Sequence, residues 1–109
     1  MAGVESSPSD PIAVSSAYDA AGNVVITVTG DLDLLAADML RRAVSRALRG
    51  ERKRVIFELS GLRFIDSAGL TVLIEASSQA TSVELLSPSP AVRRAVELTG
   101  LSDVLKVVP

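Results

Sequence analysis

Apolar and polar residues alternate in two short segments near the start of the chain, residues 11–17 and 24–29, and this two-residue period predicts two β-strands. In the second segment one face carries only branched apolar side chains, those of Val24, Ile26 and Val28. The residues between the segments, 19–23, include Asp, Gly and Asn, which favour a tight turn. The pattern therefore predicts a β-hairpin at the start of the fold.

Three later segments, residues 34–49, 67–78 and 90–99, have the period of an α-helix. In the first, one side collects apolar residues that we expect to be buried: Ala36, Met39, Leu40, Ala43, Val44 and Ala47. Asp33 is placed to cap the start of this helix and Gly50 its end. The second helix has only a narrow polar strip, so other elements must cover most of it.

A near-continuous apolar run at residues 54–59 predicts a strand buried within a parallel sheet, and shorter runs at 82–86 and 103–108 predict two more strands. The segment from Ser60 to Asp66 is predicted to be a loop that leads into the second helix. The resulting order is β-β-α-β-α-β-α-β. Such alternation predicts an α/β fold with a mixed, mostly parallel β-sheet flanked by helices.

Residues 1–10 are rich in Ser and Pro and carry few apolar side chains, so they are expected to form a flexible tail. Residues 11–109 are expected to form a single domain, since this length suits one hydrophobic core. The first residues lack the pattern of a secretory signal, and no apolar run approaches the roughly 20 residues that cross a bilayer. We therefore expect a cytoplasmic protein that does not bind a membrane.

Composition excludes several kinds of chemistry. The 109 residues include no cysteine and no histidine, which excludes disulfides, thiol catalysis, Cys/His zinc sites and a Ser-His-Asp triad within this chain. We expect no enzymatic activity, no metal site and no cofactor. A formal net charge of -2 and an aromatic content of 3% give neither a general attraction to nucleic acid nor a stacking platform for it, so no nucleic-acid partner is expected.

Two short acidic segments each precede a predicted helix: Gly-Asp-Leu-Asp at residues 30–33 and Asp-Ser-Ala-Gly at residues 66–69. The simplest interpretation is helix capping, because Asp and Ser at a helix start accept hydrogen bonds from unpaired N–H groups. The hydroxyl of Ser67, however, lies among apolar residues, namely Leu62, Phe64, Ile65, Ala68 and Leu70. Apolar residues in a loop indicate a surface that a partner covers.

The segment VIFELSGLRFIDSAGL, residues 55–70, resembles the signature of STAS domains of the bacterial anti-anti-sigma factor family, also called anti-sigma factor antagonists. Residues 29–33 (TGDLD) are similar to the family's T-G-E/D-L-D loop, and residues 89–101 (SPAVRRAVELTGL) to its S-P-x-V-x-R helix. The three motifs occur in the family's order, and the resemblance covers about residues 11–108. It implies a STAS-like fold.

The resemblance also implies a function. The family's phosphoacceptor serine, in D-S-[S/A]-G, maps onto Ser67, and the partner is an anti-sigma factor that is a GHKL-type serine kinase. The unmodified protein binds this kinase and so frees a sigma factor, phosphorylation breaks the complex, and a metal-dependent serine phosphatase restores it. The residues expected to bind the partner surround Ser67 and the first acidic segment: Asp31, Asp33, Phe64, Asp66, Ala68, Gly69 and Leu70.

Charge alone is sufficient for such a switch. A phosphoserine adds about −1.5 to −2 charges at neutral pH. If the sheet brings the two acidic segments together, this phosphate lies beside Asp31, Asp33 and Asp66. At about 6 Å and an effective dielectric near 20, one such pair repels by up to about 5 kcal/mol before screening. A loss of about 3 kcal/mol weakens binding more than a hundredfold.

Two other functions are left open. A STAS domain that no longer switches would serve as a scaffold or as a subunit of a transport or signalling assembly, although a scaffold needs no hydroxyl at Ser67. A nucleotide-binding protein that uses the helix start at Ser67 is disfavoured, because the sequence lacks a Gly-rich loop followed by Lys.

Three further features complete the expectations. The segment between Leu70 and residue 82 is about one turn shorter than is usual in the family, so the helix after Ser67 is expected to be short. The chain ends where many relatives continue into a final helix. Whether this leaves an apolar face of the sheet or of the helix at residues 90–99 open to a second copy, as in a homodimer, stays an open question. Seven of the eleven positive charges lie in residues 41–54, and a solvated helix face is favoured for them over a nucleic-acid or lipid surface: Arg41, Arg42, Arg46, Arg49, Arg52, Lys53 and Arg54.

Overall fold

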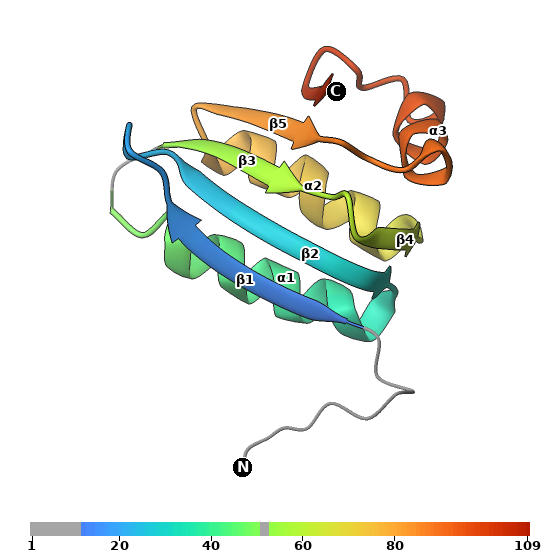
Figure 1. The fold of residues 1–109 in the computed structure, drawn as a ribbon, viewed down its shortest axis with the longest axis horizontal. Helices are drawn as coiled ribbons and strands as arrows, with labels where there is room; N and C mark the ends of the chain where they lie inside the picture. The colour runs from blue at the N-terminus through green and yellow to red at the C-terminus, as the bar shows by residue number, and fades with distance from the viewer. Residues whose placement is uncertain (1–11, 51–52) are drawn as a thin grey trace.

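The structure, a computed structural model, describes residues 12–50 and 53–109, and the tail predicted at residues 1–10 lies outside the described residues. Nine elements follow one another along this part of the chain (Figure 1). The strands are β1 (Ala13–Tyr18), β2 (Val24–Leu32), β3 (Arg54–Glu58), β4 (Leu62–Ile65), β5 (Ser82–Leu86) and β6 (Leu105–Val108). The helices are α1 (Leu34–Ala47), α2 (Ser67–Gln79) and α3 (Pro90–Leu98).

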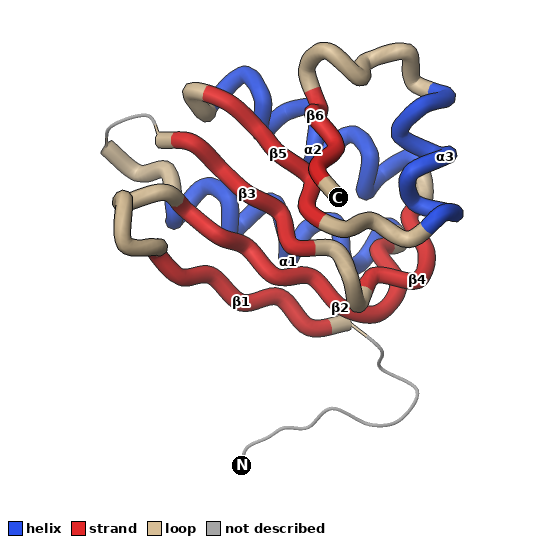
Figure 2. Tube along the Cα trace, turned by 45° about the horizontal axis from the view of Figure 1, so that its top comes forward, coloured by secondary structure: helices blue, strands red, loops and turns tan. Residues whose placement is uncertain are grey.

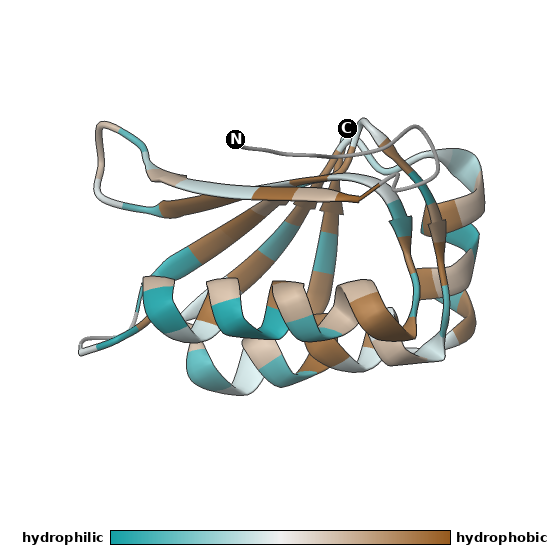
Figure 3. Cartoon of the chain, turned by 90° about the horizontal axis from the view of Figure 1, so that it is seen from below, coloured by the Kyte–Doolittle hydropathy of each residue, from teal (hydrophilic) through white to brown (hydrophobic). Residues whose placement is uncertain are grey.

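The strands form one sheet in the order β1-β2-β3-β5-β6, with β4 paired to the end of β2. β1 and β2 make the predicted antiparallel hairpin, and the other pairs are parallel. Figure 3 shows α1 and α2 beneath the same face of this sheet, while α3 lies near β4 at the end of the sheet (Figure 2). The predicted α/β fold with a mixed, mostly parallel sheet is confirmed.

The core lies between this sheet and helices α1 and α2. Every second residue of β2 is buried, as the alternation in the sequence predicts. The largest fully buried side chains include those of Ile26, Leu40, Phe57 and Leu73, one from each of the two central strands and the two covering helices. Removing this apolar surface from water at about 25 cal/mol per Å² is the main force that holds the layers together.

The prediction that Met39 is buried in the core is wrong. Met39 is 44% exposed, and Ala37 is buried in its place. The reason is that α1 packs beside α2, so the buried arc of α1 is turned toward its neighbour, and an ion pair between Arg41 Nε and Glu75 Oε1 at 3.0 Å joins the two helices on that side. Met39 faces the other way, where it lines a shallow pocket with Val14 of the edge strand β1.

The sequence interpretation of residues 60–66 as a loop is also wrong, because it contains β4. Likewise β2 does not end at residue 29 but runs to Leu32, so Asp31 lies in a strand and not in a loop. The two corrections have one cause. Gly30 adopts φ 99°, which a residue with a Cβ rarely does, and the pairing of β2 and β4 shifts register at this point. The N–H of Gly30 donates to the carbonyl of Gly61 at 3.0 Å.

The remaining boundaries differ slightly from those expected. β1 covers residues 13–18 where 11–17 were expected, α1 ends at Ala47, and β6 begins at Leu105 because residues 102–104 form a turn. α2 covers residues 67–79 where 67–78 were expected. None of the helices in residues 12–50 and 53–109 is long and apolar enough to span a bilayer.

The hairpin turn forms where it was predicted. The Asp19 carboxylate accepts hydrogen bonds from the backbone N–H groups of Asn23 and Ala21, each at 2.9 Å. These bonds favour the ionised carboxylate, so the backbone N–H of Asn23 is the main cause that holds the pKa of Asp19 below its ordinary value. The turn places β1 as an edge strand beside β2.

Candidate functional site

The two acidic segments meet at the carboxyl ends of β2 and β4. These strands run parallel, with Asp31 opposite Phe64 and Leu32 opposite Ile65. The N–H of Asp66 donates to the carbonyl of Leu32 at 3.1 Å, which fixes the start of the second segment beside the first. The sheet therefore brings the two acidic segments together, as a shared negative site requires. The pairing of β4 with β2 is what holds them side by side.

Both helices that leave this edge begin with an aspartate cap. The N–H of Ala36 donates to Asp33 Oδ1 at 3.0 Å, and the N–H of Gly69 donates to Asp66 Oδ1 at 3.1 Å. Each cap satisfies one of the N–H groups that a helix start leaves unpaired. The capping role predicted for Asp33 and Asp66 is confirmed, and it leaves each carboxylate with a second oxygen for other contacts.

Replacing Asp66 with alanine is expected to lower the free energy of unfolding by about 1 kcal/mol, because the N–H of Gly69 loses its acceptor. Asp66→Asn keeps an acceptor oxygen but removes the charge. We therefore expect its free energy of unfolding to lie within about 0.5 kcal/mol of the wild-type value. Urea denaturation of the two variants measures this difference. Equal losses for both would show that the charge, and not the cap bond, stabilises the helix start.

Ser67 is the first residue of α2, and its side chain is exposed. Its carbonyl accepts a hydrogen bond from the hydroxyl of Thr71 at 2.8 Å. Within the described part of the chain, no group forms a hydrogen bond with the Ser67 hydroxyl. An exposed and uncommitted hydroxyl at a helix start can accept a phosphoryl group, because the phosphate oxygens then lie near the unpaired N–H groups of the first turn.

Gly69 is buried and sets how closely α2 approaches the sheet. A Cβ at this position would lie 2.8 Å from Leu32 Cγ and 2.9 Å from Ile65 Cγ1. Both distances are shorter than carbon atoms tolerate, so only glycine lets the start of α2 rest on the ends of β2 and β4. The structure thus places Gly69 on the side of α2 that faces the ends of β2 and β4, and not on the outer surface.

The other predicted partner-binding residues lie around Ser67. Phe64 is 51% exposed although it is aromatic, and Ala68 and Leu70 are half-buried. Asp31 is half-buried and forms an ion pair with Arg63, whose Nε lies 3.3 Å from Asp31 Oδ1. Arg63 was not predicted, because its position beside Asp31 depends on β4. The pair offsets part of the negative charge, so Asp33 and Asp66 carry most of it.

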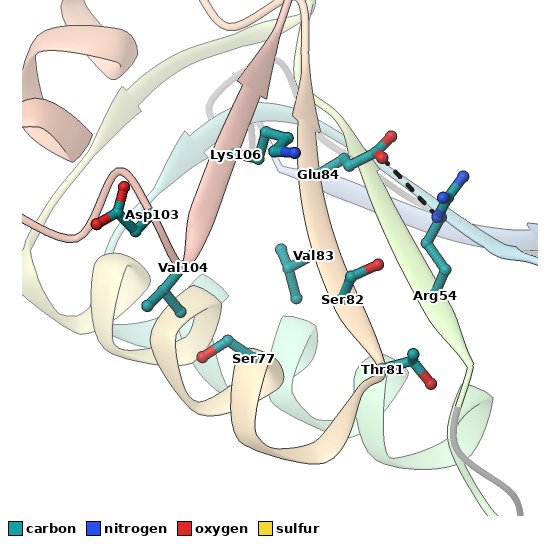
Figure 4. A pocket seen from close by; sticks show the side chains of 9 residues that line it. All are labelled: Arg54, Ser77, Thr81, Ser82, Val83, Glu84, Asp103, Val104 and Lys106. Atoms are coloured by element: carbon teal, nitrogen blue, oxygen red, sulfur yellow. Dashed lines mark ion pairs between the residues drawn. The ribbon is translucent and has the colours of Figure 1, made fainter.

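A pocket of about 360 Å³ lies at the opposite, amino-terminal ends of β3 and β5 (Figure 4). Its rim mixes two cations with two carboxylates, Arg54, Lys106, Glu84 and Asp103, and the Arg54 Nε to Glu84 Oε2 distance is 3.8 Å. None of the residues predicted to bind the partner lines it. The mixed charges give the pocket no preference for a charged ligand, so the edge at Ser67 is the better candidate.

The basic residues between positions 41 and 54 are spread over several contacts. Arg42 pairs with Asp38 at 2.7 Å, Arg41 with Glu75 at 3.0 Å, and the Lys53 amine lies 5.8 Å from the centre of the Tyr18 ring. Arg52 lies outside the described residues. This arrangement is consistent with the solvated helix face that the sequence favours.

Comparison with known proteins supports the resemblance seen in the sequence. The STAS domain family model matches residues 15–109. A relative from Lysinibacillus sphaericus, named anti-sigma F factor antagonist, is 35% identical over 83 residues, which are 72% of this chain and 71% of the relative. The anti-sigma-F factor antagonist RsfB of Mycobacterium tuberculosis is 27% identical over 101 residues, 90% of this chain and 82% of that protein.

Solved structures agree. An anti-sigma factor antagonist from Mycobacterium paratuberculosis superposes with a TM-score of 0.83 and 28% identity, covering 96% of this chain and 91% of that one. The anti-sigma factor antagonist SpoIIAA in its unphosphorylated form gives 0.76 and 27%, covering 89% of each chain. SpoIIAA of Bacillus in its phosphorylated form gives 0.70 and 25%, covering 89% and 92%. With its sequence motifs, its sheet order and these matches in agreement, the chain belongs to the STAS domain family.

Proposed function

We propose that this chain is an anti-sigma factor antagonist that binds an anti-sigma factor serine kinase while Ser67 is unmodified and is released when Ser67 is phosphorylated. The observation that carries the proposal is the exposed, uncommitted hydroxyl of Ser67 at the start of α2, directly after the capping Asp66 and at the edge of the sheet where Asp33 caps α1. The names of the relatives and of the similar structures support the same role.

The similarity to SpoIIAA supports the phosphoserine switch. That protein has been solved in an unphosphorylated and in a phosphorylated form, and both forms share the fold of this chain, with TM-scores of 0.76 and 0.70. A phosphate on Ser67 needs no refolding here either, because the start of α2 already presents N–H groups to it. The switch then acts at the surface.

The cost of desolvating a phosphate at that surface explains the release. Binding of the unmodified chain places the partner against Ser67, Phe64 and the caps of α1 and α2. A phosphate adds about −1.5 to −2 charges next to Asp33 and Asp66. A partner that is complementary to two carboxylates and a neutral hydroxyl then meets an extra anion that it must desolvate, at a cost of several kcal/mol.

The chain is a substrate in this scheme and not the catalyst. It contains no histidine that could activate the Ser67 hydroxyl, so the base and the ATP site belong to the partner. A metal-dependent serine phosphatase that removes the phosphate would return the chain to its binding form. The sigma factor is freed while the anti-sigma factor is held by this chain.

Incubation with ATP and a purified GHKL-type serine kinase encoded in the same genome tests the proposal. We expect one phosphate per chain, located at Ser67 by mass analysis, and none on the Ser67→Ala variant. Ser78→Ala removes another exposed hydroxyl of α2 and should leave the modification unchanged. Absence of phosphate at Ser67 with every such kinase, or its presence on another hydroxyl, would contradict the proposal.

A further inference from the structure

Two leucines at the start of α1 are exposed and lie outside the hydrophobic core. Leu34 and Leu35 follow the cap Asp33, and 72% and 83% of their side chains are accessible to solvent. The first turn of a helix usually carries Asp, Glu, Ser or Thr, whose oxygens suit the unpaired N–H groups, but this turn has no acidic residue. Two adjacent exposed leucines at such a place indicate contact with another molecule.

The register of the sheet places these leucines next to Ser67. Leu32 and Ile65 are paired across β2 and β4, and each is followed by a capping aspartate and then by the first residue of a helix. Leu34 in α1 thus corresponds to Ser67 in α2, and Leu35 to Ala68. The two helices lie against each other beneath the sheet (Figure 3), and packed helix axes are about 10 Å apart.

A protein that covers Ser67 also covers the leucines. A stable interface buries about 800 Å² on each partner, a patch roughly 30 Å across, which is wider than the separation of the two helix starts. The most strongly bound positions of an interface are large apolar or aromatic side chains that enter pockets of the partner. Among the exposed side chains at this edge, Leu34, Leu35 and Phe64 are the large apolar ones.

We propose that Leu34 and Leu35 are the apolar anchors that select the partner of this chain. This inference rests on the proposed function, since the occupant is the same anti-sigma factor kinase that modifies Ser67. On this inference the kinase surface opposite α1 has an apolar pocket for the two leucines. Ser67 makes binding depend on phosphorylation, whereas the leucines supply affinity that does not depend on phosphorylation.

The test is the double variant Leu34→Gln/Leu35→Gln, which keeps side-chain size and helix propensity but removes the apolar surface. Calorimetric titration with the purified kinase in the presence of ADP should show a Kd at least thirtyfold higher than for the wild type. In the phosphorylation assay the KM for the chain should rise by a similar factor while kcat stays unchanged, because the Ser67 hydroxyl is intact.

Leu98→Gln is the matched control. Leu98 is 77% exposed and is the last residue of α3. Helix α3 lies on the far side of α2 from α1 (Figure 1). Replacing Leu98 should therefore change Kd less than threefold. The single variants Leu34→Gln and Leu35→Gln should each show part of the effect, and they serve if the double variant unfolds. Thermal unfolding of every variant should match the wild type, since both leucines are exposed.

The outcomes separate the inference from the function it rests on. If the double variant binds as tightly as the wild type while Ser67 is still phosphorylated, the inference fails and the proposed function stands. If the wild-type chain neither binds a kinase nor is modified by one, both fail. Self-association of the wild type that disappears in the double variant would assign the leucines to a second copy of this chain and would overturn the inference as well.

Discussion

Ser67→Glu is expected to weaken binding to the anti-sigma factor kinase about a hundredfold, whereas Ser67→Ala should bind at least as well as the wild type and resist modification. A glutamate adds one negative charge close to Asp33 and Asp66. In the complex this charge loses its water against a surface that fits a neutral hydroxyl, at a cost of about 3 kcal/mol, and a loss of that size is about a hundredfold in Kd. The alanine variant removes only a hydroxyl.

The measurement is a titration of both variants with the kinase at two ionic strengths. The loss for Ser67→Glu should persist in high salt, because a charge buried in the interface is screened much less than an exposed one. Ser78→Glu adds the same charge near the other end of α2 and should alter Kd by less than threefold. If neither substitution at Ser67 changes binding, the chain acts as a non-switching scaffold.

The fold was largely predictable because its layers follow simple periods. The alternation in residues 24–29 marks β2, and the apolar run at 54–59 marks β3, since both strands are buried by the helices beneath them. Both aspartate caps were predicted as well, because a cap needs only local sequence. Periodicity and capping act over a few residues, and a single sequence shows them directly.

β4 was missed because nothing local distinguishes it. Its four residues are buried only at the two ends, Leu62 and Ile65, so they show neither strict alternation nor a continuous apolar run. The strand exists because Gly30 lets β2 turn and continue beside it. Consequently the ion pair of Arg63 with Asp31, and the meeting of the two acidic segments, could not be derived before the register was known.

The exposure of α1 was misjudged for a similar reason. A helical period shows which residues share a side, but it does not show which neighbour covers that side. α2 covers the side of Ala37, whereas the edge strand β1 lies near Met39. Leu34 and Leu35 lie beyond both, which is why the surface at the start of α1 became visible only in the structure.

Gly69→Val is expected to lower the free energy of unfolding by about 2 to 3 kcal/mol, the largest stability effect among these substitutions. The new Cβ would lie 2.8 Å from Leu32 Cγ and 2.9 Å from Ile65 Cγ1, so α2 must move away from β2 and β4 or those side chains must leave their rotamers. Glycine is a poor helix former, and the gain from replacing it is smaller than this cost. Urea denaturation measures the loss.

Ser78→Val is the control for this prediction, because it places the same β-branched residue on the exposed side of α2 and should cost less than about 1 kcal/mol. A displaced α2 also carries Ser67 away from the cap of α1, so the folded fraction of Gly69→Val should be phosphorylated more slowly than the wild type. If Gly69→Val is as stable as Ser78→Val, the contact with Leu32 and Ile65 does not constrain the site.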